Sequence, residues 1–142
     1  MKKAIIYLSL ITISVFAYSC RFEDASAGVA DNVVGKYTVQ KIQDSKTTIS
    51  LPTSVGEIIV TARVDINKKN ATTVDVRRVV YQKSKTKTDS TIQSDIDVVV
   101  AKSGSSFTLS KDGKEIGNLK GKTLTLESLV DKEKTTVIAE KQ

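Results

Sequence analysis

The most constraining feature of this chain is a strict two-residue alternation between Glu57 and Asn67. Apolar residues occupy every second position (Val60, Ala62, Val64 and Ile66), and polar residues stand between them (Thr61, Arg63, Asp65 and Asn67). Successive side chains of a β-strand point to opposite faces, so this pattern predicts a strand with one buried and one solvated face. A chain built from such strands must pack the apolar faces of the strands together, away from water.

The same period recurs in short segments separated by turn signals. We expect further strands at residues 33–42, 72–82, 91–102, 105–110, 114–119, 122–129 and 134–139, and a short extended piece at 47–51 that Pro52 ends. Asp112-Gly113 is the strongest tight-turn signal, because both residues suit the positive φ angles of a type I′ hairpin. No segment has a clear helical period.

The alternation also predicts which side chains face the interior. The expected inward set is Tyr37, Val39 and the stem of Lys41, then Val74, Val76, Ile92, Ile96, Val98, Val100, Phe107, Leu109, Leu124 and Leu126. The period slips at Arg77–Val79, which suggests a bulge or a strong bend there. Asp95 and Asp97 are expected to face solvent together.

These strands and turns predict an all-β fold. Up-and-down connections without helical crossovers favour a small antiparallel barrel of about eight strands, with a β-sandwich as the alternative. Closure removes the free strand edges that favour aggregation. We expect the barrel interior to be filled by Val, Ile, Leu and Ala side chains, without room for a ligand.

The N-terminus predicts export. Lys2 and Lys3 precede the uncharged, mostly apolar run 4–17, and this order is typical of a secretory signal peptide. We expect a signal peptide at 1–19, a flexible tether at 20–32 and one β-domain at 33–142.

Ala17-Tyr18-Ser19-Cys20 resembles the lipobox of bacterial lipoproteins. The resemblance implies that Cys20, the single cysteine of the chain, carries fatty acids such as palmitate after cleavage before it. Glu23 and Asp24 resemble the acidic export signal of surface lipoproteins in Bacteroidetes-type bacteria. We therefore expect a protein of the cell envelope, anchored by lipid to the outer membrane and either periplasmic or surface-exposed.

Two stretches resemble lipocalin-like proteins. Val34-Gly35-Lys36-Tyr37 is similar to their Gly-x-Trp start, with Tyr37 in place of Trp, and residues 121–126 are similar to a late hairpin of bacterial lipocalin-like lipoproteins. The resemblance implies an eight-stranded, calycin-like barrel that holds a small apolar ligand at its mouth.

The composition excludes several kinds of chemistry. Without histidine, a Ser-His-Asp or Cys-His nucleophile cannot form, and one cysteine without histidine cannot build a zinc site. We therefore expect a non-enzymatic protein without a cofactor. The net charge of +6 is spread along the chain with no aromatic platform for bases, so we do not expect nucleic acid as a partner.

Two groups of residues are candidate sites. Arg77, Arg78, Lys83, Lys85 and Lys87 suit an anionic ligand, since the three lysines alternate and would line one side of an extended hairpin. Ser90, in Asp89-Ser90-Thr91, fits an O-glycosylation pattern of Bacteroidetes-type bacteria. We expect a lipid-anchored domain that binds a glycan, a small apolar ligand or another envelope protein. The alternative is a carrier that shuttles an apolar molecule inside the barrel.

Overall fold

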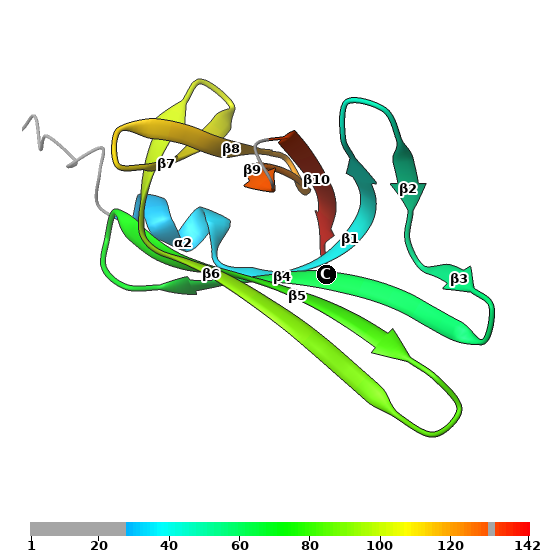
Figure 1. Ribbon diagram of the computed structural model, residues 1–142. Helices are drawn as coiled ribbons and strands as arrows, with labels where there is room; N and C mark the ends of the chain where they lie inside the picture. The colour runs from blue at the N-terminus through cyan, green and yellow to red at the C-terminus, as the bar shows by residue number, and fades with distance from the viewer. Residues whose placement is uncertain (1–27, 131–132) are drawn as a thin grey trace, which may run out of the picture.

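Ten strands form one antiparallel sheet that curls round and closes on itself (Figure 1). The computed structural model describes residues 28–130 and 133–142. The strands are β1 (Gly35–Gln43), β2 (Thr48–Ser50), β3 (Thr53–Val55), β4 (Ile58–Lys68), β5 (Thr73–Lys83), β6 (Thr88–Ser103), β7 (Ser106–Lys111), β8 (Lys114–Lys120), β9 (Thr123–Val130) and β10 (Glu133–Lys141). A short helix, α2 (Val29–Val33), precedes them.

Closure of the barrel depends on β1, which hydrogen-bonds to β10 on one side and to β4 on the other. Eight strands form the closed barrel, and β2 and β3 are additional. β1 leaves β4 after Thr38, and β2 and β3 then pair with the diverging parts of β1 and β4. The predicted antiparallel barrel is confirmed, and the sandwich alternative is wrong.

The predicted tight turn at Asp112-Gly113 is also confirmed. The two residues have φ angles of 50° and 74° and join β7 to β8 as a two-residue hairpin. Positive φ at both positions is the signature of a type I′ turn, whose twist matches that of the flanking strands. Local turn chemistry therefore sets this part of the register.

Two bulges redirect the alternation in ways that the sequence pattern did not reveal. In β1 the register shifts between Val39 and Lys41, so Ile42 lines the interior and Lys41 is exposed. In β6 the extra residue falls at Ile96–Asp97, where Asp97 has a φ of 58°. Each extra residue reverses which face the following side chains occupy.

The β6 bulge overturns three expectations. Ile92 and Ile96 are not inward but 49% and 57% exposed, whereas Val98 and Val100, beyond the bulge, are buried as predicted. The bulge lies in β6 and not at Arg77–Val79. The two acidic residues also separate, because Asp95 faces the interior and Asp97 lies on the surface with an ion pair to Lys69.

The core fills the half of the barrel nearest α2. Its largest fully buried side chains are Tyr37, Ile66, Leu109, Leu124 and Leu126, with valines from β4, β5 and β6 between them. Phe107, expected inward, is partly buried against this cluster. This half of the barrel agrees with the filled interior that the sequence predicts.

Helix α2 closes that end of the barrel, although residues up to Asn32 were expected to be a flexible tether. Val29, Ala30 and Val33 belong to the core, and the Ala30 N–H donates to the Ala71 carbonyl at 3.0 Å. The prediction is therefore wrong for residues 29–32, and the folded unit extends back to Gly28. The cause is burial, because Val29, Ala30 and Val33 pack against the end of the barrel and are removed from water.

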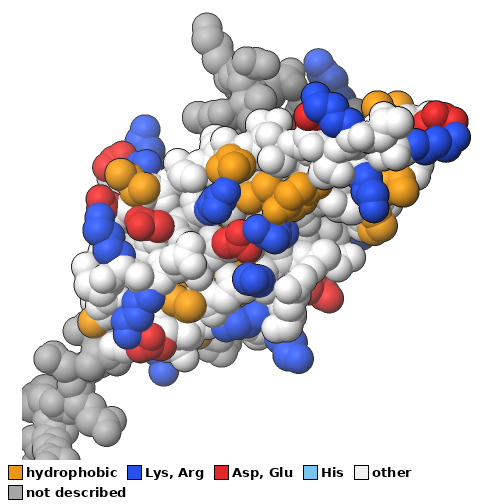
Figure 2. Space-filling model, turned by 90° about the horizontal axis from the view of Figure 1, so that it is seen from below, with side chains coloured by type: hydrophobic (Ala, Val, Ile, Leu, Met, Phe, Trp, Pro, Cys, Tyr) orange, Lys and Arg blue, Asp and Glu red, His pale blue; other side chains and the backbone are white. Residues whose placement is uncertain are grey.

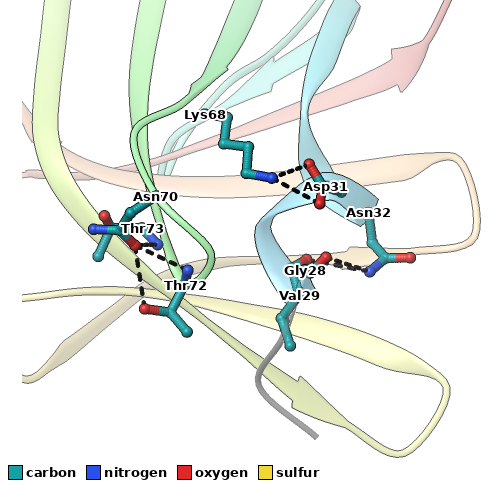
Figure 3. Close-up of polar contacts among 8 residues, drawn as sticks. All are labelled: Gly28, Val29, Asp31, Asn32, Lys68, Asn70, Thr72 and Thr73. Atoms are coloured by element: carbon teal, nitrogen blue, oxygen red, sulfur yellow. Dashed lines mark hydrogen bonds and ion pairs between the residues drawn. The ribbon is translucent and has the colours of Figure 1, made fainter. Parts of the chain in front are cut away.

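Polar contacts around the loop between β4 and β5 hold the helix in place (Figure 3). Lys68 at the end of β4 reaches Asp31 of α2, with its Nζ atom 2.7 and 2.8 Å from the two carboxylate oxygens. The Asn70 Oδ1 atom accepts hydrogen bonds from the backbone N–H groups of Thr72 and Thr73 at 2.9 and 2.8 Å. The loop is thus shaped to meet the helix.

Tyr37 connects this closed end to both termini of the domain. Its hydroxyl donates a hydrogen bond of 2.6 Å to the Val33 carbonyl, and the Lys141 ammonium lies 5.9 Å from the ring centre. Burial raises the pKa of the Tyr37 hydroxyl to about 12. The ring is completely buried, so it must remain neutral in the folded state.

We expect stability to fall as the pH rises from 10 to 12. The unfolded chain loses the Tyr37 proton near pH 10 while the folded chain keeps it to about pH 12, so deprotonation favours unfolding by about 2–3 kcal/mol over this window. Urea unfolding of the wild type and of Tyr37→Phe at each pH measures the effect. The variant lacks this titration, and equal losses in both proteins would refute the assignment.

Candidate functional site

The half of the barrel away from α2 holds a cavity of about 220 Å³. Its apolar lining comprises Val39, Ile42, Ala62, Val64, Val79, Val80 and Val137, and its polar lining comprises Arg63, Arg78, Thr91, Gln93, Ser128 and Thr135. The expectation of a completely filled interior is therefore wrong for this half. The volume exceeds the ~150 Å³ of an apolar protein cavity that accommodates benzene.

The cavity exists because small side chains meet diverging strands. Ala62, Ser128 and Thr135 are small residues of this lining, whereas the core of the other half contains several leucines and a tyrosine. Here β1 and β4 no longer pair with each other, and β2 and β3 stand between them. The strands of this half therefore enclose more space than their side chains fill.

One side of this half lacks a continuous wall. β6 pairs with β7 only from Val99 to Ser103, and β9 pairs with β8 only from Thr123 to Leu126, so the remaining edges of β6 and β9 face a gap. A polar cleft at this gap is lined by Arg78, Gln93, Asp95, Lys114, Glu115, Ile116, Glu127, Ser128 and Lys134. Arg78, Gln93 and Ser128 line both the cleft and the cavity, so the two adjoin.

Arg78 is the principal polar group at this junction. Its side chain is 11% exposed and forms a salt bridge with Asp95, and its Nη1 atom donates to Gln93 Oε1 at 3.0 Å. Asp95 is also 3.8 Å from the Lys111 ammonium. The Nε atom of Arg78 is buried and has no hydrogen-bond partner in the described residues.

Arg78 was predicted as a site residue, but as part of a basic group on the surface. Because it pairs with Val64 and Gln93 across the sheet, its side chain points inward with theirs. The alternation Val74, Val76, Arg78, Val80 contains this information, since position 78 keeps the inward phase. The adjacent Arg77 holds the opposite phase and is exposed.

The other predicted anion-binding residues do not form one basic surface with Arg78. Lys83 ends β5, and the Ser84 N–H donates to the Lys87 carbonyl at 2.8 Å, so Lys85 and Lys87 lie in a tight turn and not along one side of a strand. Lys85 pairs with Glu57 and Lys87 with Asp89. The face seen in Figure 2 likewise shows basic side chains interspersed with acidic ones.

Of the two predicted modification sites, Ser90 and Cys20, only Ser90 lies within the described residues. Ser90 is exposed in β6, opposite Tyr81 of β5. It therefore lies within a strand and not at a loop end, on the part of β6 that has no β7 partner. Cys20, the predicted lipidation site, lies outside the described residues.

The described residues contain neither a cluster of metal ligands nor a membrane-spanning helix. Within residues 28–130 and 133–142, no three His, Cys, Asp or Glu side chains are grouped so that they could hold a metal ion. No helix in the same part of the chain has the length and apolar character needed to cross a membrane.

Comparison with known proteins gave no relative. No protein-family model, curated protein or solved structure matches this chain significantly.

Proposed function

We propose that this domain binds a small apolar ligand inside the open half of its barrel. The observation that supports the proposal is the cavity of about 220 Å³, most of whose side-chain lining is aliphatic. Apolar cavities with a few polar groups at one end are the usual form of small-molecule sites. This favours the carrier alternative over a domain that acts only through its outer surface.

The proposed setting is the cell envelope, with the domain held by a lipid on Cys20. The support for this part is the lipobox-like sequence and the charged, then apolar N-terminus. A non-enzymatic binding role agrees with the composition, which lacks histidine. A binding domain on a lipid anchor would keep its ligand at the membrane surface.

The volume of the cavity limits the ligand. At about 220 Å³ it is smaller than the ~300–1,000 Å³ typical of sites for drug-sized molecules. A single ring or a medium-length alkyl chain matches this space, whereas a whole phospholipid does not. The gap between β6 and β9 would let a ligand enter from the side.

Filling the cavity is expected to weaken binding strongly. Ala62→Leu places three additional carbon atoms in the cavity, and the loss of contacts equivalent to two methylene groups weakens binding about tenfold. The control is Thr61→Leu, which adds an apolar side chain to the exposed face of the same strand and leaves binding unchanged.

The measurement is isothermal titration calorimetry with 1-octanol as a neutral apolar probe, because its medium-length alkyl chain matches the cavity volume. Saturable binding by the wild type and Thr61→Leu, with the weaker binding expected of Ala62→Leu, supports the proposal. No saturable binding by the wild type, or equal binding by all three proteins, would refute it.

A further inference from the structure

The polar group at the cavity mouth carries an unbalanced positive charge. Arg78 and Lys111 both contact Asp95, so the three side chains together carry a net charge of +1. The remaining charged residues of the adjoining cleft balance one another, since Lys114 and Lys134 stand beside Glu115 and Glu127. One negative charge on a ligand would therefore neutralise the group.

The hydrogen-bonding capacity of Arg78 is also incompletely used. A guanidinium carries five N–H donors, and the described contacts occupy its Nη1 and Nη2 atoms. The buried Nε–H has no acceptor among the residues that the structure describes. A buried donor without an acceptor destabilises the folded protein, so a ligand that supplies one would be favoured.

A carboxylate would both neutralise the positive charge and supply an acceptor to Arg78. It carries a single negative charge and two oxygens that accept parallel hydrogen bonds from the planar guanidinium. Arg78 lines the apolar cavity as well as the cleft, so an oxygen bound to it leaves the rest of the ligand facing Val64 and Val80. Partial removal from water strengthens this interaction relative to one on the open surface.

We propose that the ligand is an amphiphile with one carboxylate, bound by Arg78, and a short apolar tail in the cavity. This inference rests on the proposed function and specifies its ligand class. Asp95 acts as a positioning residue, because its salt bridge fixes the guanidinium at the junction. Lys111 contributes the charge that keeps the group cationic.

The test compares octanoate with 1-octanol, which share a chain length and differ in the head group. Each is titrated into the wild type and into Arg78→Met by isothermal titration calorimetry. We expect the wild type to bind octanoate at least tenfold more tightly than 1-octanol, as one charge-assisted bidentate contact implies (about tenfold per 1.4 kcal/mol). Arg78→Met should remove this preference and bind 1-octanol within about twofold of the wild type.

Two further variants make the result specific. Arg77→Met removes the adjacent, outward-facing arginine and should keep the full preference for octanoate. Arg78→Lys keeps the charge without the planar fork and should retain only part of the preference. Retained binding of 1-octanol shows in each case that the barrel has folded.

The outcomes separate this inference from the proposed function. Equal affinities for octanoate and 1-octanol in the wild type, or an undiminished preference in Arg78→Met, overturn the carboxylate inference while the neutral probe still reports the cavity. Failure of the wild type to bind either 1-octanol or octanoate overturns the proposed function and the inference with it.

Discussion

Gly117→Ala is expected to lower the free energy of unfolding by about 2–4 kcal/mol, within the upper range of overpacking substitutions. Gly117 lies in β8, where a Cβ atom would stand 2.3 Å from the Thr125 carbonyl oxygen and 2.7 Å from Leu126 Cδ2. The first of these atoms belongs to the backbone, so no side-chain rotation can relieve the contact. The strands β8 and β9 would have to separate at the point where Gly117 pairs with Leu126.

Urea unfolding at neutral pH measures this effect. The matched control is Gly104→Asn, at a turn glycine with a φ of 60°, where a Cβ atom would meet nothing within 4 Å beyond its chain neighbours. Asparagine tolerates the left-handed region, so we expect a change of less than about 1 kcal/mol there. An unfolding free energy for Gly117→Ala within ~0.5 kcal/mol of the wild type would show that β8 and β9 are not packed as described.

Ala30→Glu should destabilise the domain by at least about 3 kcal/mol. Ala30 is completely buried between α2 and the barrel, so a glutamate there must either lose its water without a partner or push the helix away. Displacing the helix also exposes Val29 and Val33 and removes the carbonyl that accepts the Tyr37 hydrogen bond.

The control for this prediction is Asn32→Glu, which adds the same charge to an exposed position of α2 and loses only two long hydrogen bonds of 3.3 Å, from the Asn32 Nδ2 atom to the Gly28 and Val29 carbonyls. Its midpoint of thermal unfolding should stay close to that of the wild type. If Ala30→Glu and Asn32→Glu unfold at the same temperature as the wild type, α2 is not part of the folded unit. That outcome would restore the expected boundary at Val33.

The fold could be predicted because its main signals are local. The alternation in Glu57–Asn67 and the turn at Asp112-Gly113 each depend on a few adjacent residues, and both specify antiparallel hairpins. When such hairpins follow one another without crossovers, closing the sheet into a barrel buries the apolar face of every strand. The eight-stranded barrel follows from these features.

The cavity could not be predicted because it depends on bulges and on strand divergence. One additional residue in β1 places Ile42, in place of Lys41, inside the barrel. One additional residue in β6 turns Gln93 and Asp95 inward in place of Ile92 and Ile96. Neither bulge is marked by glycine or proline. The polar lining was therefore assigned to the surface, and the interior was expected to be uniformly apolar.

The short helix was missed for a different reason. α2 spans five residues, too few to show a helical period, and its stability comes from burying Val29, Ala30 and Val33 against the barrel. A polar, small-residue composition is shared by linkers and by short terminal helices. Only the tertiary contact distinguishes them.

The two halves of the barrel differ: one holds both chain ends, and the other holds the cavity and the lateral gap between β6 and β9. Gly28 lies beside α2, and the Gln142 N–H donates to the Lys36 carbonyl at the same closed end, whereas the cavity lies in the opposite half. Under the proposed attachment at Cys20, the eight residue steps to Gly28 span at most ~29 Å. The closed end would then lie within that distance of the bilayer, and the cavity would lie in the half of the barrel farther from the point of attachment.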